Sequence, residues 1–347
     1  MPGTQPPPLR HQAAPRWRTR ALAVASAAAL AAAAAGCGSG SGPSSAPTSS
    51  VATSSSSVVA SGCGQGGGAG SSTLHLSIGG HTRVVIVHLP TGYSGTTPVA
   101  LVLNMHGSTS DARQQEALTG MDATSNQDGF IVAYPQALIT DGAGFDWNVP
   151  DEPLVSGSMP PKNAANDVTF LTQLPAVLAR RYCIDLRRVY ATGISGGGRM
   201  ASQLACNSPG TVAAVAPVAG LRFPAPCATS RDVPVVAFHG TADPVDPYNG
   251  NGLAYWTYSV PVAEQRWAAH ESCAHTTMTS GKGYGLTAST GCAGGSIVEL
   301  YSLTGEGHEW PGGPTLPASI TKVLGPQTNA VDANSVMWAF FSAYRLP

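Results

Sequence analysis

Charged side chains are scarce in this sequence of 347 residues. Asp, Glu, Lys and Arg together make up 11% of it, and the formal net charge is −1. A chain with so little charge of either sign produces no long-range electrostatic field that would attract nucleic acid or an anionic membrane surface. We therefore expect neither of these partners and favour a neutral, weakly charged substrate.

Metal-binding motifs are also absent from the sequence. Its nine histidines form no H-E-x-x-H pattern and no His/Asp cluster at helical spacing. No close pair of cysteines has the spacing of a zinc site. We expect the protein to need no metal and no cofactor.

An apolar segment long enough to span a membrane is missing as well. Residues 21–35 are uncharged and rich in alanine, but they are fewer than the roughly 20 residues that a membrane-spanning helix requires. Arg16, Arg18 and Arg20 lie just before this run. A basic stretch followed by a short apolar run is typical of a secretory signal peptide, which we assign to residues 1–36.

Cys37 directly follows the signal peptide, in a context that resembles the bacterial lipobox. In that motif the cysteine receives a lipid and becomes the new N-terminus. The leucine that usually stands three residues before the cysteine is absent here, so cleavage and release without a lipid is the alternative. We expect an extracellular protein whose sole membrane attachment would be a lipid on Cys37, on the outer face of the cell membrane.

The next segment is of low complexity. Residues 38–70 are nearly all Ser, Gly, Thr, Ala and Pro, a composition that buries too little apolar surface to offset the entropy of ordering. We interpret residues 37–72 as a flexible tether. No second break of this kind follows, so residues 73–347 are expected to form one catalytic domain, and the protein a monomer.

The sequence Gly-Ile-Ser-Gly-Gly at 193–197 is the strongest functional motif. It follows a strand-like run, 188–192, and precedes a helix-like run, 199–205. This is the context of a nucleophile elbow, in which small residues two before and two after the serine let the chain turn sharply. Ser195 is therefore the candidate nucleophile; the alternative is a small residue in an ordinary tight turn.

A nucleophilic serine needs a histidine to take its proton and a carboxylate to orient that histidine. Asp243 follows a buried strand-like run at 235–238, and His308 follows another at 297–301. The order Ser, Asp, His is that of hydrolases with such an elbow. Asp246 lies in the same loop as Asp243 and is its rival for the role.

Six stretches together resemble the secreted esterases of the polyhydroxybutyrate depolymerase and feruloyl esterase group. They are 101–107 (LVLNMHG), 129–135 (GFIVAYP), 166–170 (NDVTF), 185–198 (DLRRVYATGISGGG), 239–243 (HGTAD) and 307–313 (GHEWPGG). The resemblance extends from about Leu74 onward and implies an α/β-hydrolase fold. It also implies Ser195 as nucleophile, Asp243 as orienting acid and His308 as general base.

The tetrahedral intermediate of such an esterase needs backbone N–H donors for its oxyanion. We expect one from Gly196, the residue after the nucleophile, and one from the loop after an early strand. In that loop we favour Ser108, with Thr109 as the alternative.

Other polar or aromatic residues lie near these positions in the sequence. His106 and Trp310 are candidates for contact with substrate, although His106 also fits a packed, hydrogen-bonded residue and Trp310 fits ordinary packing. His239 is expected to be structural. Glu306 and Glu309 flank His308 and are expected to be surface groups or groups that support the site without touching substrate.

Seven cysteines are present, and setting Cys37 aside leaves six, which is consistent with three disulfides in an exported protein. Six cysteines allow fifteen pairings. Closeness in the sequence and the family resemblance favour Cys206 with Cys227 and Cys273 with Cys292, which leaves Cys63 with Cys183.

Strand-like and helix-like runs alternate along the chain, which predicts a mostly parallel sheet with helices on both faces. Strands are expected at 83–88, 99–105, 130–134, 189–192, 235–238 and 297–301. Helices are expected near 112–125, 167–182, 197–206, 262–270 and 330–344.

These observations predict a serine carboxylester hydrolase that works through an acyl-enzyme. The resemblance implies feruloyl or acetyl esters of plant polysaccharide, or a polyhydroxyalkanoate polyester, as the substrate. The loop at 148–163, rich in Pro and Gly, is expected to influence which ester is accepted. The alternative function is a surface-anchored protein that binds carbohydrate or another ligand on a catalytically silent hydrolase fold.

Overall fold

A computed structural model describes residues 62–347 of the chain. The expected signal peptide, the lipidation site Cys37 and most of the tether lie outside the described residues. The last part of that tether is described, and it belongs to the folded body: Cys63 is bonded to Cys183, and the first strand begins at Gly70. Within residues 62–347, no helix combines the length and apolar character needed to cross a membrane.

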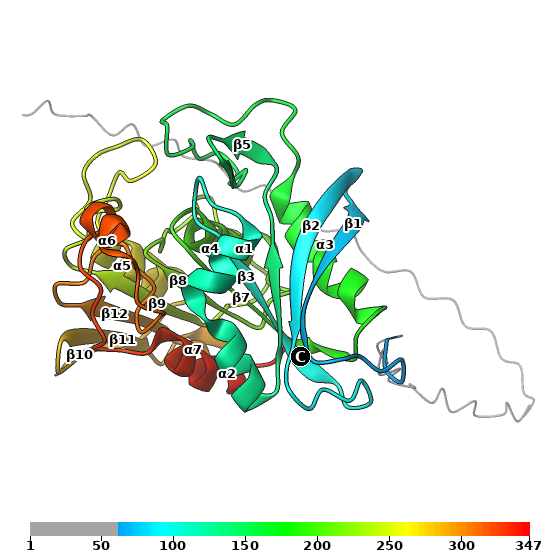
Figure 1. Cartoon of the computed structure of the whole chain (residues 1–347). Helices are drawn as coiled ribbons and strands as arrows, with labels where there is room; N and C mark the ends of the chain where they lie inside the picture. The colour runs from blue at the N-terminus through cyan, green and yellow to red at the C-terminus, as the bar shows by residue number, and fades with distance from the viewer. Residues whose placement is uncertain (1–61) are drawn as a thin grey trace, which may run out of the picture. The chain divides into compact units, whose positions relative to one another are not determined.

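A ten-stranded sheet forms the centre of the fold, in the order β1-β2-β4-β3-β7-β8-β9-β12-β11-β10 (Figure 1). The six strands from β4 to β12 pair in parallel, whereas β1, β2, β10 and β11 add antiparallel edges. The strands are β1 Gly70–Ile78, β2 His81–Leu89, β3 Val99–Met105, β4 Ile131–Pro135, β7 Ile184–Ile194, β8 Ala214–Val218, β9 Val235–Gly240, β10 His275–Gly281, β11 Tyr284–Thr290 and β12 Val298–Leu303. A separate small hairpin pairs β5 Ile139–Asp141 with β6 Gly144–Asp146.

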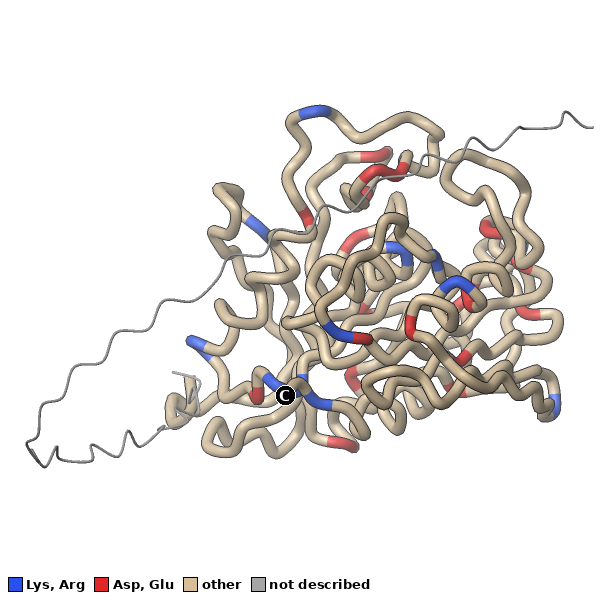
Figure 2. Tube along the Cα trace, turned by 180° about the vertical axis from the view of Figure 1, so that it is seen from behind, with Lys and Arg blue, Asp and Glu red and all other residues tan. Residues whose placement is uncertain are grey.

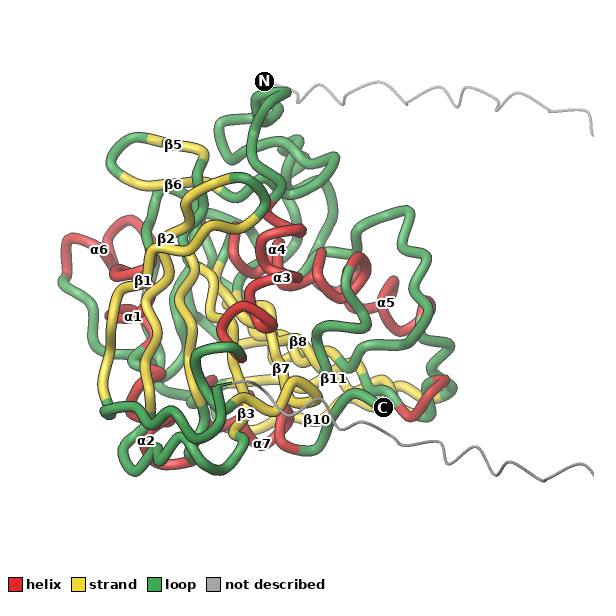
Figure 3. Tube along the Cα trace, turned by 90° about the vertical axis from the view of Figure 1, so that its right-hand side faces the viewer, coloured by secondary structure: helices red, strands yellow, loops and turns green. Residues whose placement is uncertain are grey.

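Helices cover both faces of the sheet. Figures 1 and 3 show α3, α4 and α5 on one side and α1, α2 and α7 on the other. The helices are α1 Ala112–Thr119, α2 Met121–Asp128, α3 Asp167–Ala179, α4 Gly196–Asn207, α5 Val260–His270, α6 Ala318–Leu324 and α7 Ala333–Ser342. This arrangement confirms the predicted α/β-hydrolase fold.

Strand side chains alternate between two hydrophobic cores. In β3, Leu101 and Leu103 pack on the side of α3 and α4, and Val102 packs on the side of α7. Successive residues of a strand point to opposite faces, so a strand covered by helices on both faces is apolar throughout. The uninterrupted apolar runs in the sequence have this cause.

Side-chain caps fix where several helices begin. Asp111, Asn166 and Asp332 accept hydrogen bonds from backbone N–H groups in the first turns of α1, α3 and α7. The single helix expected at 112–125 is two helices, because Gly120 adopts φ 55° and ends α1 before α2 begins.

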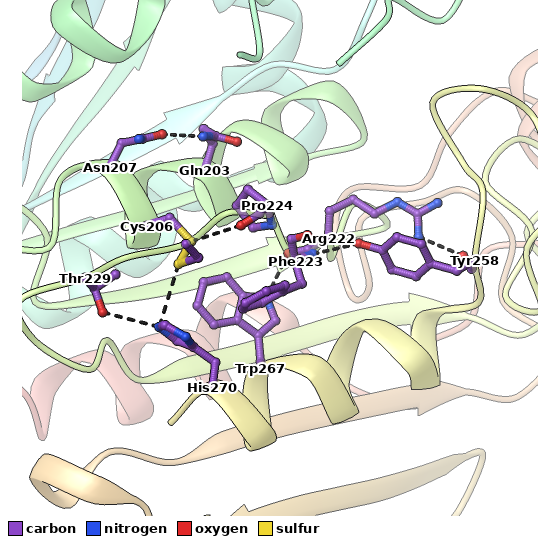
Figure 4. Close-up of a disulfide and its surroundings, with 11 residues drawn as sticks. Gln203, Cys206, Asn207, Arg222, Phe223, Pro224, Thr229, Tyr258, Trp267 and His270 are labelled. Carbon is purple, nitrogen blue, oxygen red and sulfur yellow. Dashed lines mark hydrogen bonds between the residues drawn. A yellow bond between two sulfur atoms is a disulfide. The ribbon is translucent and has the colours of Figure 1, made fainter. Parts of the chain in front are cut away.

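Three disulfides tie loops to this framework. They join Cys63 to Cys183, Cys206 to Cys227 and Cys273 to Cys292. Figure 4 shows the second of them, between the end of α4 and the loop that carries Arg222 and Phe223. Phe223 and Trp267 of α5 pack edge to face beside it. The helix that begins after Ser195 is thereby joined covalently to a neighbouring loop.

Candidate active site

Ser195 lies at the sharp turn between β7 and α4. Its backbone has φ 55° and ψ −119°, a conformation that costs energy for a residue with a side chain. The N–H of Ser195 donates to the carbonyl of Val218 at 3.0 Å, which holds this conformation. A Cβ on Gly197 would lie 2.2 Å from the carbonyl oxygen of Met105, so the elbow requires glycine there. The chain at Ser195 therefore has the strained, closely packed turn that the nucleophile-elbow motif predicts.

His308 and Asp243 are in direct contact. Nδ1 of His308 donates to Oδ2 of Asp243 at 2.7 Å, and both side chains are buried. The other carboxylate oxygen of Asp243 accepts from the N–H groups of Val245 and Asp246, each at 2.8 Å. The carboxylate is thus fixed in position, and the histidine ring with it.

Asp243 and His308 each favour the charged form of the other. Burial acts to raise the pKa of Asp243, but the charge of His308 and hydrogen bonds from His239 and His308 outweigh it, so the pKa lies below its usual value. Burial acts to lower the pKa of His308, but the charge and hydrogen bond of Asp243 outweigh it, so this pKa is raised. The structure therefore favours an ionised Asp243 and stabilises a protonated His308.

Asp246, the sequence rival of Asp243, makes no hydrogen bond to His308 among the described residues. Its backbone N–H supports Asp243, and its backbone carbonyl accepts from Nε2 of His239 at 2.8 Å. The same nitrogen of His239 lies 3.3 Å from Oδ2 of Asp243. Asp243, and not Asp246, is therefore the carboxylate that accepts a hydrogen bond from His308.

Ser195 and His308 line the same cavity, which has a volume of about 720 Å³. No hydrogen bond joins the two side chains within the described part of the chain; such contacts are often long in the absence of substrate. The other lining residues are mostly small or apolar: Gly107, Ser108, Thr109, Ser110, Gln114, Ala117, Leu118, Val155, Ile194, Val245, Pro314, Thr315, Leu316, Ile320, Val323 and Leu324. Of all the described residues that line the cavity, His308 is the one with a titratable side chain.

Backbone N–H groups lie close to Ser195. A Cβ on Gly196 would lie 2.7 Å from Oγ and 3.2 Å from the backbone nitrogen of Ser108, so these two residues pack directly together. The N–H of Thr109 already donates to Oδ1 of Asp146 at 3.0 Å. The N–H of Ser108 has no such acceptor among the described residues. The arrangement favours Ser108 over Thr109 as a donor toward the cavity.

His106 and Trp310, the two predicted substrate contacts, do not line the cavity. His106 is fully buried, with Nδ1 bonded to the carbonyl of Gly107 and Nε2 to the N–H of Ala137. Burial lowers its pKa to about 4. Trp310 is also fully buried and donates from its indole nitrogen to Asn334. Both residues support the loops around the site from inside the core.

Glu306 and Glu309, on either side of His308, are both buried. Glu306 accepts from the backbone N–H and hydroxyl of Thr328 and so joins the His308 loop to the segment before α7. Burial raises the pKa of Glu309 to about 7, and its carboxylate has no hydrogen-bond partner among the described residues.

Sequence reasoning missed Asp146 and most of the cavity wall. Asp146 ends the β5–β6 hairpin and is 37 residues from Thr109, whose amide it holds. Leu316, Ile320 and Val323 come from α6 and the loop before it. Few of these residues stand in a periodic apolar pattern, so local sequence gives no signal for them.

Comparison with known proteins finds similarity to esterases. Residues 84–251 match the family described as Esterase PHB depolymerase. The chain is 30% identical over 242 residues to feruloyl esterase B of Piromyces equi, an alignment that covers 65% of this chain and 42% of that protein. It is 27% identical over 254 residues to poly(3-hydroxyalkanoate) depolymerase C of Paucimonas lemoignei, covering 65% and 58% respectively. The chain thus spans about half of the length of these curated relatives.

A solved structure shares the fold. The acetyl xylan esterase from Aspergillus awamori superposes with a TM-score of 0.50 at 16% identity, covering 73% of this chain and 99% of that one. At this identity the likeness concerns the fold alone. The elbow, the family match and the fold agree: residues 84–251 match the Esterase PHB depolymerase family, and the chain has an α/β-hydrolase fold.

Proposed function

We propose that the protein is a serine carboxylester hydrolase. The observation that carries this proposal is the shared cavity of Ser195 and His308, in which His308 is already held by Asp243. His308 in its neutral form takes the proton of the Ser195 hydroxyl as Oγ attacks the ester carbonyl. Asp243 fixes the tautomer of the ring and stabilises the imidazolium that forms.

The reaction then proceeds through a covalent intermediate. The amides of Gly196 and Ser108 stabilise the oxyanion of the tetrahedral intermediate. The imidazolium gives its proton to the leaving alkoxide, the carbon–oxygen bond breaks, and the acyl group remains on Ser195. A water molecule, deprotonated by His308, attacks this acyl-enzyme and releases the acid.

The cavity supports an ester with an apolar acyl group. Among the described residues of its wall, none but His308 is titratable, and the wall includes aliphatic residues from several segments. The names of the relatives concern feruloyl esters and poly(3-hydroxyalkanoate), and both carry apolar acyl groups. We propose feruloyl or acetyl esters of polysaccharide, or a polyhydroxyalkanoate-type polyester, as the natural substrate.

We also propose that the enzyme acts outside the cell. Three disulfides fit an oxidising compartment. In this proposal residues 1–36 direct export, Cys37 receives the lipid, and the segment that follows tethers a monomeric catalytic domain.

The test compares the wild type with Ser195→Ala on p-nitrophenyl acetate, p-nitrophenyl butyrate, methyl ferulate and a hydroxybutyrate oligomer. We expect the substitution to lower kcat by about 10⁶-fold, as removal of a nucleophile does in serine hydrolases. The relative rates of the wild type rank the substrate classes. A wild type no faster than Ser195→Ala on every ester would refute hydrolysis and favour the ligand-binding alternative.

A further inference from the structure

The 148–163 loop contributes to the wall of the active-site cavity. It connects β6 to α3 and arches above β5 in Figure 1. Val155 of this loop lines the same cavity as Ser195 and His308. The position of the loop therefore affects how much room an ester has beside Ser195.

The base of the loop is fixed independently of its tip. The backbone N–H of Asn148 donates to Oδ2 of Asp167 at 2.8 Å, and its side-chain amide donates to the carbonyl of Ala165 at 3.0 Å. Asp167 is itself bonded to Arg83 at 2.6 Å. These contacts close the base, but they lie several residues from Val155.

Arg199 ties the middle of the loop to the nucleophile helix. It stands one turn after Ser195 on α4, and its backbone N–H donates to the carbonyl of Ser195 at 2.9 Å. Its Nη1 donates to the carbonyl of Pro153 at 3.3 Å and lies 3.4 Å from Oε2 of Glu152. The Arg199 side chain is 4% exposed and that of Glu152 is 24% exposed, so water screens the pair only in part. One arginine thus reaches from the helix of Ser195 to residues two and three positions before Val155.

A second arginine strengthens the attraction for the loop. Arg222 is buried, lies over the ring of Trp256 at 3.4 Å and donates to the carbonyl of Tyr258 at 2.7 Å. Its charge acts on Glu152 together with that of Arg199. Figure 4 shows how Arg222 is held beside Tyr258. Glu152 therefore contacts Arg199 and also interacts electrostatically with Arg222.

We propose that Arg199 and Glu152 are specificity determinants: their contact holds the 148–163 loop against α4 and thereby sets the size of ester accepted beside Ser195. This inference rests on the proposed esterase function. Both are positioning residues, because neither lines the cavity, and they act on substrate through Val155. Loss of the contact loosens the loop and weakens binding of a bulky ester, while a small ester that does not reach the loop is unaffected.

Two readouts test this inference, one of them independent of activity. Lys162 is the one Lys or Arg in the 148–163 loop and is exposed, so trypsin cleavage after it reports how often the loop opens. We expect Glu152→Ala to accelerate this cleavage about threefold, the effect of losing a partly exposed ion pair. We expect a similar, about threefold rise in KM for a hydroxybutyrate oligomer, with kcat and KM for p-nitrophenyl acetate unchanged.

Three further variants provide the controls. Asp151→Asn removes the charge of an exposed neighbour in the same loop and should match the wild type in both readouts. Glu152→Gln retains an acceptor for Arg199 and should fall between the wild type and Glu152→Ala. Val155→Ala alters the wall alone, so it should change KM for the oligomer without changing the rate of cleavage.

The outcomes separate this inference from the proposed function. If Glu152→Ala behaves like Asp151→Asn in both readouts, or changes every ester equally, the inference is wrong. If the wild type hydrolyses no ester while Glu152→Ala still accelerates cleavage after Lys162, the loop contact is supported and the esterase proposal fails, along with the role of the contact in specificity.

Discussion

His308 can act as a base only in its neutral form, and its surroundings favour the protonated form. Its pKa is raised above the ordinary value of 6.5, because Asp243 outweighs the effect of burial. As pH rises through this pKa, the neutral fraction and the rate both rise. We expect the pH profile of kcat/KM on p-nitrophenyl acetate to have its acid-side midpoint above 6.5. A midpoint below that value would contradict the ionic contact with Asp243.

The two aspartates of one loop are expected to differ in their importance. Asp243 bonds the ring of His308, whereas Asp246 contributes backbone groups to the loop. Asp243→Asn should lower kcat by about 10⁴-fold, because an amide stabilises neither the correct tautomer nor the imidazolium. Asp246→Asn, which makes the same chemical change, should retain most of the activity. Equal losses in the two variants, measured with the same ester, would show that this assignment is wrong.

Single residues were predictable where a motif and chain order restrict them. Ser195, Asp243 and His308 were each predicted from their place after a strand. In the structure Ser195 and His308 line one cavity and Asp243 bonds His308, and their catalytic roles stay a prediction. His106 and Trp310 were misplaced because their hydrogen-bond partners, Ala137 and Asn334, are remote in sequence. A local pattern gives no information on which polar group meets such a side chain in the core.

At the scale of elements, a buried ion pair holds the start of α3 against β2. Arg83 and Asp167 are each 1% exposed, and the guanidinium also lies over the ring of Phe170 at 4.4 Å. Asp167→Ala leaves this cation buried without its partner, so the free energy of unfolding should fall by about 3–5 kcal/mol. Chemical denaturation measures the loss.

The control for this prediction removes both charges. Arg83→Met combined with Asp167→Asn keeps an acceptor for the N–H of Asn148 and leaves no unpaired cation. The double variant should therefore lose less stability than Asp167→Ala alone. A larger loss of stability in the double variant would contradict this explanation. It would mean that attraction within the ion pair, and not the cost of an unpaired buried charge, accounts for the loss in Asp167→Ala.

The predicted strands include five of the six parallel strands at the sheet centre but miss β8, and at the edges they include β2 but miss β1, β10 and β11. The expected strands at 99–105 and 235–238 are β3 and β9, buried on both faces. β10 was missed because each of its seven residues is exposed, so its sequence shows no apolar alternation. The break between α1 and α2 depends on Gly120, one glycine whose left-handed conformation the pattern of neighbouring residues does not specify.

For the whole molecule, the Cys63–Cys183 disulfide spans the largest part of the chain. It joins residues 120 positions apart, whereas Cys206 and Cys227 are 21 apart. In the chain-entropy account a longer closed loop restricts the unfolded state more. Replacing Cys63 and Cys183 by serine should lower the free energy of unfolding by about 4–5 kcal/mol, against about 3 kcal/mol for the Cys206–Cys227 pair. Chemical denaturation of the two double variants measures these losses. The prediction is wrong if the variant without the Cys206–Cys227 disulfide is the less stable of the two.

The low charge of the sequence has a counterpart in the whole structure. Figure 2 shows acidic and basic residues interspersed along the trace. The class of the fold was predictable because a parallel sheet between helices gives long apolar strands alternating with helical runs. The cavity was not, because its wall combines residues from at least four segments that lie far apart in the sequence.

The central claim is that His308 activates Ser195 as a nucleophile, and covalent labelling tests it most directly. Phenylmethylsulfonyl fluoride transfers its sulfonyl group to an activated serine oxygen with loss of fluoride and a proton. We predict one label per chain, in the tryptic peptide 189–199 that contains Ser195, with no labelling of Ser195→Ala and far slower labelling of His308→Ala. A label at another residue, or equal labelling rates in the wild type and His308→Ala, would contradict this account.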